Sequence, residues 1–313
     1  MTCWRLYSYV SVAAIALSWL LPRGPVRADN GIVDSGARFL TVGGGARALA
    51  LAETYIAETE DPFVLFYNPA AAACSPAARL GLAHHEHFQN THGEYIALAV
   101  PAGRWGLGLG LQYLAISDIP KRSGPSAEPL AIFDAADFML QGSLNCRITP
   151  KVGVGLSCKG VFEKIDTKVA NGIAFDLGGV YAVSDRIRLG AAFNNLGPEI
   201  SFDEDPYKLP SAFRLGGAYV VPAWSIRGEL VSYDNEATNV HLGGEYIVTV
   251  SPEAPGIRFA SLGLRGGYVF GHDTRSWSAG FGIAIKRLAV DYAFVPYAED
   301  LGNTHRFGLR FDL

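Results

Sequence analysis

The sequence has few charged residues and few cysteines for its length. Only 18% of its 313 residues are Asp, Glu, Lys or Arg, against roughly one quarter in soluble domains. Of four cysteines, Cys3 lies in the N-terminal segment discussed below, which leaves Cys74, Cys146 and Cys158. An odd number in an exported chain argues against a disulfide framework. No block of basic residues is present either, which argues against a nucleic-acid partner.

A long apolar run is also missing. Beyond residue 28, no stretch approaches the roughly 18 residues that a transmembrane helix needs. Residues 1–28 themselves have the features of a secretory signal peptide: a basic residue, Arg5, an apolar run from Val10 to Leu21, and the small-residue site Val26-Arg27-Ala28. The alternative is a membrane anchor, but a run of 12 residues is too short to span a bilayer as a helix. We therefore expect an exported protein that begins near residue 29.

The dominant pattern is an alternation of period two, which predicts β-strands. For example, Trp105, Leu107 and Leu109 alternate with Gly106 and Gly108. About fourteen such segments follow one another, and most have the roughly 9 to 11 residues of a tilted membrane-crossing strand. We place them near residues 79–88, 94–100, 104–117, 134–146, 152–163, 172–183, 187–194, 210–221, 224–232, 239–248, 258–270, 275–285, 288–296 and 303–313. Longer polar links are expected at residues 118–133, 199–209 and 251–257.

The two faces of these strands differ in kind. One face is aromatic and aliphatic, and the other has Gly, Ser and Asn with scattered charges, which a bilayer would penalise by about 2–4 kcal/mol each at its midplane. We therefore predict an all-β fold, a transmembrane antiparallel β-barrel of about 14 strands with these charges in the lumen. They are Lys159, Glu163, Asp176, Arg188, Arg214, Arg227, Glu229, Glu245, Arg265, Asp291, Arg306 and Arg310.

The alternative is a soluble β-sandwich, in which the apolar face packs inward. The export signal, the number of strands and the end of the chain favour the barrel. The last segment alternates apolar and polar residues up to Leu313, whereas soluble chains more often end in a frayed polar tail.

The segment from Gly43 to Cys74 differs from the strands because it is rich in Ala and contains helix-start signals. Asp61-Pro62 predicts a short helix to Tyr67, and Asn68-Pro69 predicts a second turn through Ala73. We interpret residues 29–78 as a partly helical plug, and residues 79–313 as the barrel that encloses it. An ordinary surface helix in front of a β domain is the alternative.

The chain resembles the FadL-type transporters of long-chain fatty acids, and more closely their PorV/PorQ-type relatives. The likeness is carried by Gly45-Ala46-Arg47-Ala48, Glu60-Asp61 and Tyr67-Asn68-Pro69-Ala70-Ala71, and later by Ala192-Phe193-Asn194-Asn195-Leu196-Gly197, Leu209-Pro210 and Arg214-Leu215-Gly216-Gly217-Ala218-Tyr219. It implies a fourteen-stranded barrel with an N-terminal hatch that contains Asn68, Pro69 and Ala70. It also implies diffusion of a hydrophobic ligand, released when the hatch rearranges. Glu53 departs from the pattern, which has a small neutral residue there.

From this we expect a bacterial outer-membrane channel for passive uptake of hydrophobic molecules such as long-chain fatty acids, surrounded by outer-membrane lipids. The alternative is a barrel that does not transport and serves as a secretion or assembly partner. Arg residues that face the lumen would suit a carboxylate, because the guanidinium pairs with it through two hydrogen bonds. The candidate ligand-path residues are Phe63, Leu65, Phe66, Leu114, Met139, Arg214, Arg227 and Arg265.

Other chemistry is not favoured. On a strand His85 and His87 point the same way and could bind a metal with His92, but hydrated histidines at a barrel rim are the preferred interpretation, and we expect no metal and no cofactor. His272, Asp273, Ser276 and His305 form no recognisable nucleophile, base and orienting group. We therefore expect no enzyme activity.

Overall fold

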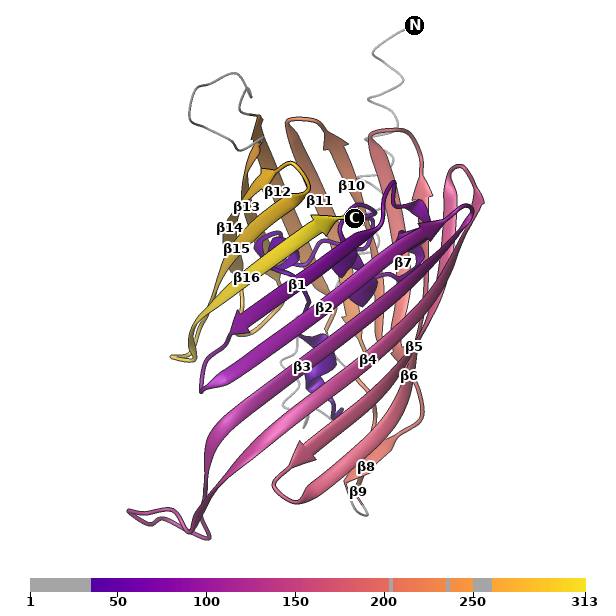
Figure 1. The fold of residues 1–313 in the computed structure, drawn as a ribbon. Coiled ribbons are helices and arrows are strands. Elements are labelled where there is room, and N and C mark those ends of the chain that lie inside the picture. Colours follow the sequence, from indigo (N-terminus) through magenta and orange to yellow (C-terminus); the bar gives the residue numbers. More distant parts are fainter. Residues whose placement is uncertain (1–34, 203–204, 235–236, 250–260) are drawn as a thin grey trace, which may run out of the picture. The chain divides into compact units, whose positions relative to one another are not determined.

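The computed structural model describes residues 35–202, 205–234, 237–249 and 261–313, so the predicted signal peptide lies outside the described residues. Fourteen antiparallel strands close into a barrel (Figure 1), which confirms the predicted fold class and the number of strands. The strands are β1 (Arg79–Glu86), β2 (Thr91–Ala102), β3 (Trp105–Lys121), β4 (Ala131–Thr149), β5 (Val152–Ile165), β6 (Lys168–Ala182), β7 (Ile187–Leu196), β10 (Ala212–Val221), β11 (Trp224–Tyr233), β12 (Asn239–Thr249), β13 (Ser261–Phe270), β14 (Trp277–Ile285), β15 (Leu288–Tyr297) and β16 (Gly302–Asp312).

Each of these strands pairs with its neighbours in the sequence, except that β7 pairs with β10 and β1 with β16. The pairing of β1 with β16 closes the barrel, with Arg79 opposite Asp312 and Glu86 opposite His305. With no free sheet edge, the backbone N–H and C=O groups of every strand can hydrogen-bond to a neighbouring strand, as a sheet in a membrane requires. No helix among the described residues is long and apolar enough to cross a membrane.

The predicted division of faces is confirmed. Trp105, Leu107 and Leu109 are exposed on the outer face, and the residues between them face inward. The inward charges Lys159, Asp176, Arg214, Arg227, Glu229, Glu245, Asp291 and Arg306 are all buried. The lumen is filled, so the core lies inside the cylinder, and the large apolar residues of the opposite strand face line the outside.

Two of the three predicted links are wrong in part, and the third, at residues 251–257, lies outside the described residues. The link at residues 199–209 contains a two-stranded hairpin, β8 (Ile200–Phe202) with β9 (Asp205–Tyr207). Ile200 is buried in a cluster with Phe39 and Leu209, so tertiary packing stabilises a hairpin that is too short to be recognised from its sequence. The link at residues 118–133 is shorter than predicted, because β3 and β4 continue past an irregularity between Ile116 and Ile119. A bulge of this kind interrupts the alternation from which we placed the strand ends.

The segment in front of β1 lies inside the barrel, where Figure 1 shows its short indigo helices. They are η1 (Arg38–Thr41), α2 (Ala46–Ala50), η2 (Pro62–Phe66) and η3 (Pro69–Cys74). We call residues 35–78 the plug. Residues of η3 contact β2 to β6, and those of α2 contact β13 to β16, so the plug meets the wall on opposite sides. Residues 34–313 form one compact unit, and the division at residue 78 into two parts stays a prediction.

Both predicted helix starts in the plug are correct. The Asp61 carboxylate accepts a hydrogen bond from the Phe63 amide at 3.0 Å, and the Asn68 side chain accepts one from the Ala70 amide at 3.0 Å. A proline follows each of these residues as the first helical residue. The helices are 3₁₀ turns, which end at Phe66 and at Cys74. Turns this short are stable here because the wall buries them.

Candidate functional site

The site is the contact between the plug and the inner wall. Asn68 is a fully buried residue of this contact. Besides capping η3, its side-chain amide donates hydrogen bonds to the carbonyl oxygens of Ile56 at 2.7 Å and of Gly179 at 3.1 Å. Thus one side chain joins two parts of the plug to the wall. The flanking predicted residues Pro69 and Ala70 are buried beside it.

Small residues on the wall let the plug backbone approach closely. A Cβ atom at Gly190 of β7 would lie 2.2 Å from the Ile56 carbonyl oxygen, and one at Gly155 of β5 would lie 2.5 Å from the backbone of Pro69. No side chain fits at such distances. The close approach of the plug therefore explains the glycines at positions 155 and 190, which face the lumen as predicted.

An ion-pair network joins α2 to four strands, β12, β13, β15 and β16. Arg47 of α2 binds both oxygens of Glu245, at 3.0 and 2.6 Å. Glu245 also accepts from Arg265 at 2.7 Å, and Arg265 donates to Asp291 at 2.6 Å. Asp291 accepts in turn from Arg310 at 2.7 Å. The network alternates in sign, so each buried charge is compensated by its neighbours, as burial in a low dielectric requires.

A second set of ion pairs holds the loop between α2 and η2. Glu58 accepts from Arg227 of β11 at 2.7 Å and from Arg47 at 3.1 Å. Asp61 lies 3.4 Å from Arg310. Burial opposes ionisation of Glu58, but Arg227 and Arg47 outweigh it and hold the pKa of Glu58 well below its usual value. Glu58 is therefore a carboxylate at neutral pH, with cations from both the plug and the wall.

Glu53, where the sequence departs from the FadL-type pattern, is accommodated by the wall. It is buried with a positive φ of 61°. Its carboxylate lies 2.5 Å from Arg275, in the loop before β14, and 3.7 Å from Arg214 of β10. Burial raises the pKa of Glu53, but the two guanidinium groups outweigh it and lower the pKa to about 2. The charge thus adds an ion pair between plug and wall, and the plug packs closely around it.

The predicted ligand-path residues lie in different places. Phe66, Met139 and Arg214 line a common cavity. Phe63 packs against Ala83, Tyr95 and Ala97, and Leu65 packs against Ala72 and Ala99, so both seal the plug against the wall. Leu114 is buried near Met139 but does not line the cavity.

The three candidate arginines all have acidic partners. Arg214 donates to Glu229 at 2.7 Å, Arg227 donates to Glu58 at 2.7 Å, and Arg265 binds Glu245 and Asp291. A ligand carboxylate would have to compete with these buried carboxylates. Their position in the lumen is as expected, but their partners could not be read from the sequence.

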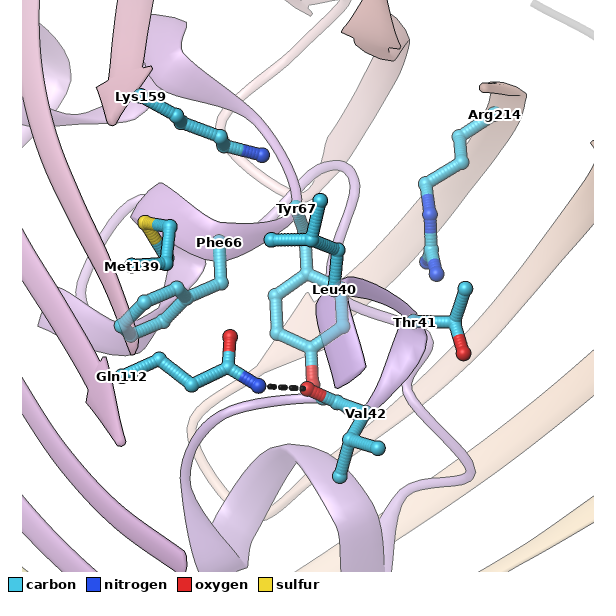
Figure 2. A pocket seen from close by; sticks show the side chains of 10 residues that line it. Leu40, Thr41, Val42, Phe66, Tyr67, Gln112, Met139, Lys159 and Arg214 are labelled. Carbon is cyan, nitrogen blue, oxygen red and sulfur yellow. Dashed lines mark hydrogen bonds between the residues drawn. The ribbon is translucent and has the colours of Figure 1, made fainter. Parts of the chain in front are cut away.

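The cavity is shown in Figure 2. It lies between the plug and the wall, with Leu40, Val42 and Phe66 on the plug and Gln112, Met139, Lys159 and Arg214 on strands of the wall. The space open to the centre of a water molecule is about 20 Å³, which is room for roughly one or two waters and not for an aromatic ring. A larger molecule therefore fits this cavity only if the plug moves.

Sequence reasoning missed the part of this cavity formed by Leu40, Thr41 and Val42, because nothing in the sequence distinguishes η1 from a linker. It also missed Gln112, which donates a hydrogen bond to the Phe39 carbonyl oxygen at 2.7 Å. Lys159 was placed in the lumen correctly, and it is neutralised by Asp176 at 2.8 Å. The alternation of the predicted strand indicates that Gln112 faces the lumen. Its partner Phe39 could not be predicted, because that contact depends on where the plug lies.

The alternative grouping of His85, His87 and His92 as metal ligands is wrong, and so is the preferred interpretation of His85 as a hydrated rim residue, because it is fully buried. His85 faces the lumen and is buried against Tyr95, with ring centroids 4.2 Å apart. His92 is exposed and faces outward, because it is one of the residues of β2 that alternate with buried Thr91, Gly93 and Tyr95. The turn at residues 87–90 reverses the chain so that His85 is opposite Gly93, not His92.

Comparison with solved structures finds the same fold in proteins described as hydrocarbon transporters or channels. The toluene transporter TbuX of Ralstonia pickettii superimposes with a TM-score of 0.61 at 15% identity, over 87% of this chain and 98% of that one. The monoaromatic hydrocarbon channel CymD gives 0.61 at 12% identity, with the same two coverages of 87% and 98%. A FadL homologue of Pseudomonas aeruginosa gives 0.53 at 13% identity, over 87% and 98% of the two chains. The chain shares their fold.

At such low sequence identities, the superpositions show a shared fold and do not show a shared ligand or function. No protein-family model and no curated protein sequence matches the chain. The FadL homologue agrees with the FadL-type resemblance noted from the motifs. The closer relation to PorV/PorQ-type proteins stays a prediction.

Proposed function

We propose that this protein is a channel of the bacterial outer membrane through which hydrophobic small molecules enter passively. The observation that carries the proposal is a lumen filled by a plug that contacts the wall through hydrogen bonds, ion pairs and packing, around a cavity with apolar residues of both plug and wall. The apolar outer face of the barrel suits a bilayer. The fold shared with toluene and monoaromatic hydrocarbon channels supports the same class of ligand.

The lining of the cavity favours an uncharged ligand. Lys159 and Arg214 are the cations that line it, and each already has a buried carboxylate within 2.8 Å. A carboxylate ligand would gain little from cations that are already neutralised, and it would lose its hydration. A small apolar molecule loses nothing of that kind, and it gains contact with Leu40, Phe66 and Met139.

Arg306 favours a second candidate, the uptake of fatty acids. It is 1% exposed, and its Nε and Nη1 atoms have no hydrogen-bond partner among the described residues. Its neighbour across the ladder is His85, whose two ring nitrogens are equally without partners in the described part of the chain. A carboxylate bound to Arg306 would remove the cost of a buried unpaired cation.

Uptake by cells tests the proposal and separates the two ligand classes. The full chain is produced in a bacterial host that lacks channels of this kind, and the entry of labelled toluene, palmitate and sucrose is measured. We expect faster entry of toluene, unchanged exclusion of sucrose, and slower toluene entry in the Phe66→Ala and Met139→Ala variants. Palmitate entry that is lost in Arg306→Ala would support the fatty-acid candidate.

A barrel that folds and inserts but accelerates neither toluene nor palmitate would contradict the proposal. That result would favour the non-transporting secretion or assembly partner. Insertion is checked by the shift in gel mobility on heating, which reports a folded barrel independently of uptake.

A further inference from the structure

The outer face of the β1–β2 hairpin has four side chains that can bind metals, apart from the lumen site. His84 and Glu86 lie on β1, and His92 and Glu94 lie on β2. The register places His84 opposite Glu94 and Glu86 opposite His92. Since alternate residues of a strand share a face, all four side chains project from the same side of the two strands. The result is a square of two imidazoles and two carboxylates.

The distances within the square are short. Glu86 bridges the two histidines, with one carboxylate oxygen 2.9 Å from His84 Nε2 and the other 3.1 Å from His92 Nδ1. The ligand atoms of His84, Glu86 and His92 all lie within 4.8 Å of one another. Bonds of about 2.0–2.2 Å from nitrogen and carboxylate oxygen to a zinc ion need separations of this order. Small rotations of three exposed side chains are enough to form the site.

Glu94 supplies a further feature of zinc sites. Its carboxylate lies 2.6 Å from His84 Nδ1, the ring nitrogen on the opposite side from Nε2. A histidine that binds a metal through one nitrogen usually donates the other N–H to a carboxylate, which fixes the ring and its tautomer. Glu94 is therefore placed to hold Nδ1 protonated and leave the Nε2 lone pair for a metal.

We propose that His84, Glu86 and His92 bind a zinc ion, with Glu94 orienting His84. Two imidazole ligands select zinc and related transition metals over Ca²⁺ and Mg²⁺, which prefer oxygen. Three protein ligands leave a fourth position for water. A bound ion would join β1 to β2 beside their turn.

The cluster lies where a membrane meets water and not within the apolar band. Phe307 of β16 lies opposite His84, and Tyr113 of β3 lies opposite Glu94. Aromatic residues of this kind mark the membrane–water interface in barrels. The next outward residues toward the middle of the strands are Leu82 and Ile96. The side chains of His84, Glu86, His92 and Glu94 are 39–54% exposed, so an ion in solution can reach them.

The test is isothermal titration of the full folded barrel with zinc chloride in detergent, purified without a histidine tag. The background has Cys158→Ser, since this exposed thiol could also bind zinc. We expect one saturable site. Binding should weaken by more than about 100-fold in His84→Ala, His92→Ala and Glu86→Gln, and by about 10–100-fold in Glu94→Gln.

The matched control is His272→Ala. This histidine lies in the link between β13 and β14, which β15 and β16 separate from β1, so its removal should leave zinc affinity unchanged. The heat-induced gel shift of each variant shows whether it is folded. Zinc that does not bind to a folded wild-type barrel, or that binds equally well without His84 and His92, would overturn the proposal and leave a hydrated salt-bridge cluster. Equal affinity for Ca²⁺ would also overturn it.

Discussion

At the scale of single residues, the interior of this barrel is organised by charge pairs between plug and wall. Glu53, Glu58 and Asp61 of the plug each lie near an arginine of the wall. Removing one member of such a pair leaves an uncompensated buried charge, which is more damaging than the pair is stabilising. Individual acidic residues of the plug therefore decide how firmly it is seated.

Glu53→Gln should change how stability depends on pH. The pKa of Glu53 in the folded protein is about 2, below its ordinary value of 4.5. The ionised group thus stabilises the fold above pH 4.5, by roughly 3 kcal/mol, and this contribution is lost as the pH falls toward 2. We expect the wild type to lose melting temperature more steeply than Glu53→Gln over this interval, measured by the heat-induced gel shift.

Glu60→Gln is the control for this experiment, because Glu60 is an exposed carboxylate of the same plug. It should behave as the wild type. Parallel pH profiles for the wild type and Glu53→Gln would show that Glu53 is not stabilised by its arginines.

At the scale of elements, the plug is a set of short turns that depend on the wall. η2 and η3 have correct caps and prolines, but each has only five or six residues, and isolated helices of this length do not form in water. Glycines of β5 and β7 create the room into which these turns and the loop before them fit. The two surfaces are complementary in shape as well as in charge.

Gly190→Ala should loosen the plug without breaking the barrel. The added Cβ would lie 2.2 Å from the Ile56 carbonyl oxygen, so the loop between α2 and η2 has to shift. Overpacking of this kind typically costs about 1–3 kcal/mol. We expect a higher single-channel conductance in planar bilayers, as the lumen is no longer fully closed.

Gly142→Ala provides the comparison, since a Cβ there meets no atom within 4 Å and the residue is exposed on β4. Its conductance should equal that of the wild type. If the conductance of Gly190→Ala also equals that of the wild type, the loop between α2 and η2 does not help to close the channel.

At the scale of the whole molecule, the plug and the barrel together determine what can pass. The described cavity is too small for an aromatic ring, so the proposed function requires movement of the plug against the wall. The contacts that would have to break are ion pairs, hydrogen bonds and the apolar packing of Phe63 and Leu65, and the polar groups among them can form hydrogen bonds with water once the plug moves.

Locking the plug by a disulfide should therefore stop uptake. A Cβ at Gly308 of β16 would lie 3.3 Å from Ala46 Cβ of α2, close to the separation of about 3.5–4.5 Å in disulfides. In a background with Cys74, Cys146 and Cys158 replaced by Ser, the Ala46→Cys/Gly308→Cys variant should lose toluene uptake when oxidised and regain it with a reductant.

Each single cysteine variant controls for the substitutions themselves and should be insensitive to the reductant. Uptake by the oxidised, cross-linked barrel at the wild-type rate would mean that ligands pass without movement of α2.

Much of this protein could be predicted from local patterns. Alternation fixed which residues of the strands face inward, as for Arg214 and Glu245, because a strand has only two faces. Asp61-Pro62 and Asn68-Pro69 gave the helix starts, since a cap is decided by residues adjacent in the chain. The fourteen strands of the barrel followed from the same alternation, although their ends near Asp118 did not, because a bulge shifts the pattern.

The partners across the lumen were decided only by the tertiary structure. Nothing in the sequence links Glu53 to Arg275 or Asn68 to Gly179, because these contacts depend on where the plug lies against the wall. The same holds for the square of His84, Glu86, His92 and Glu94, whose register is set by the turn of the hairpin. The sequence determined the faces of the strands and the identity of the charges, and the closure of the barrel around the plug determined which charges meet.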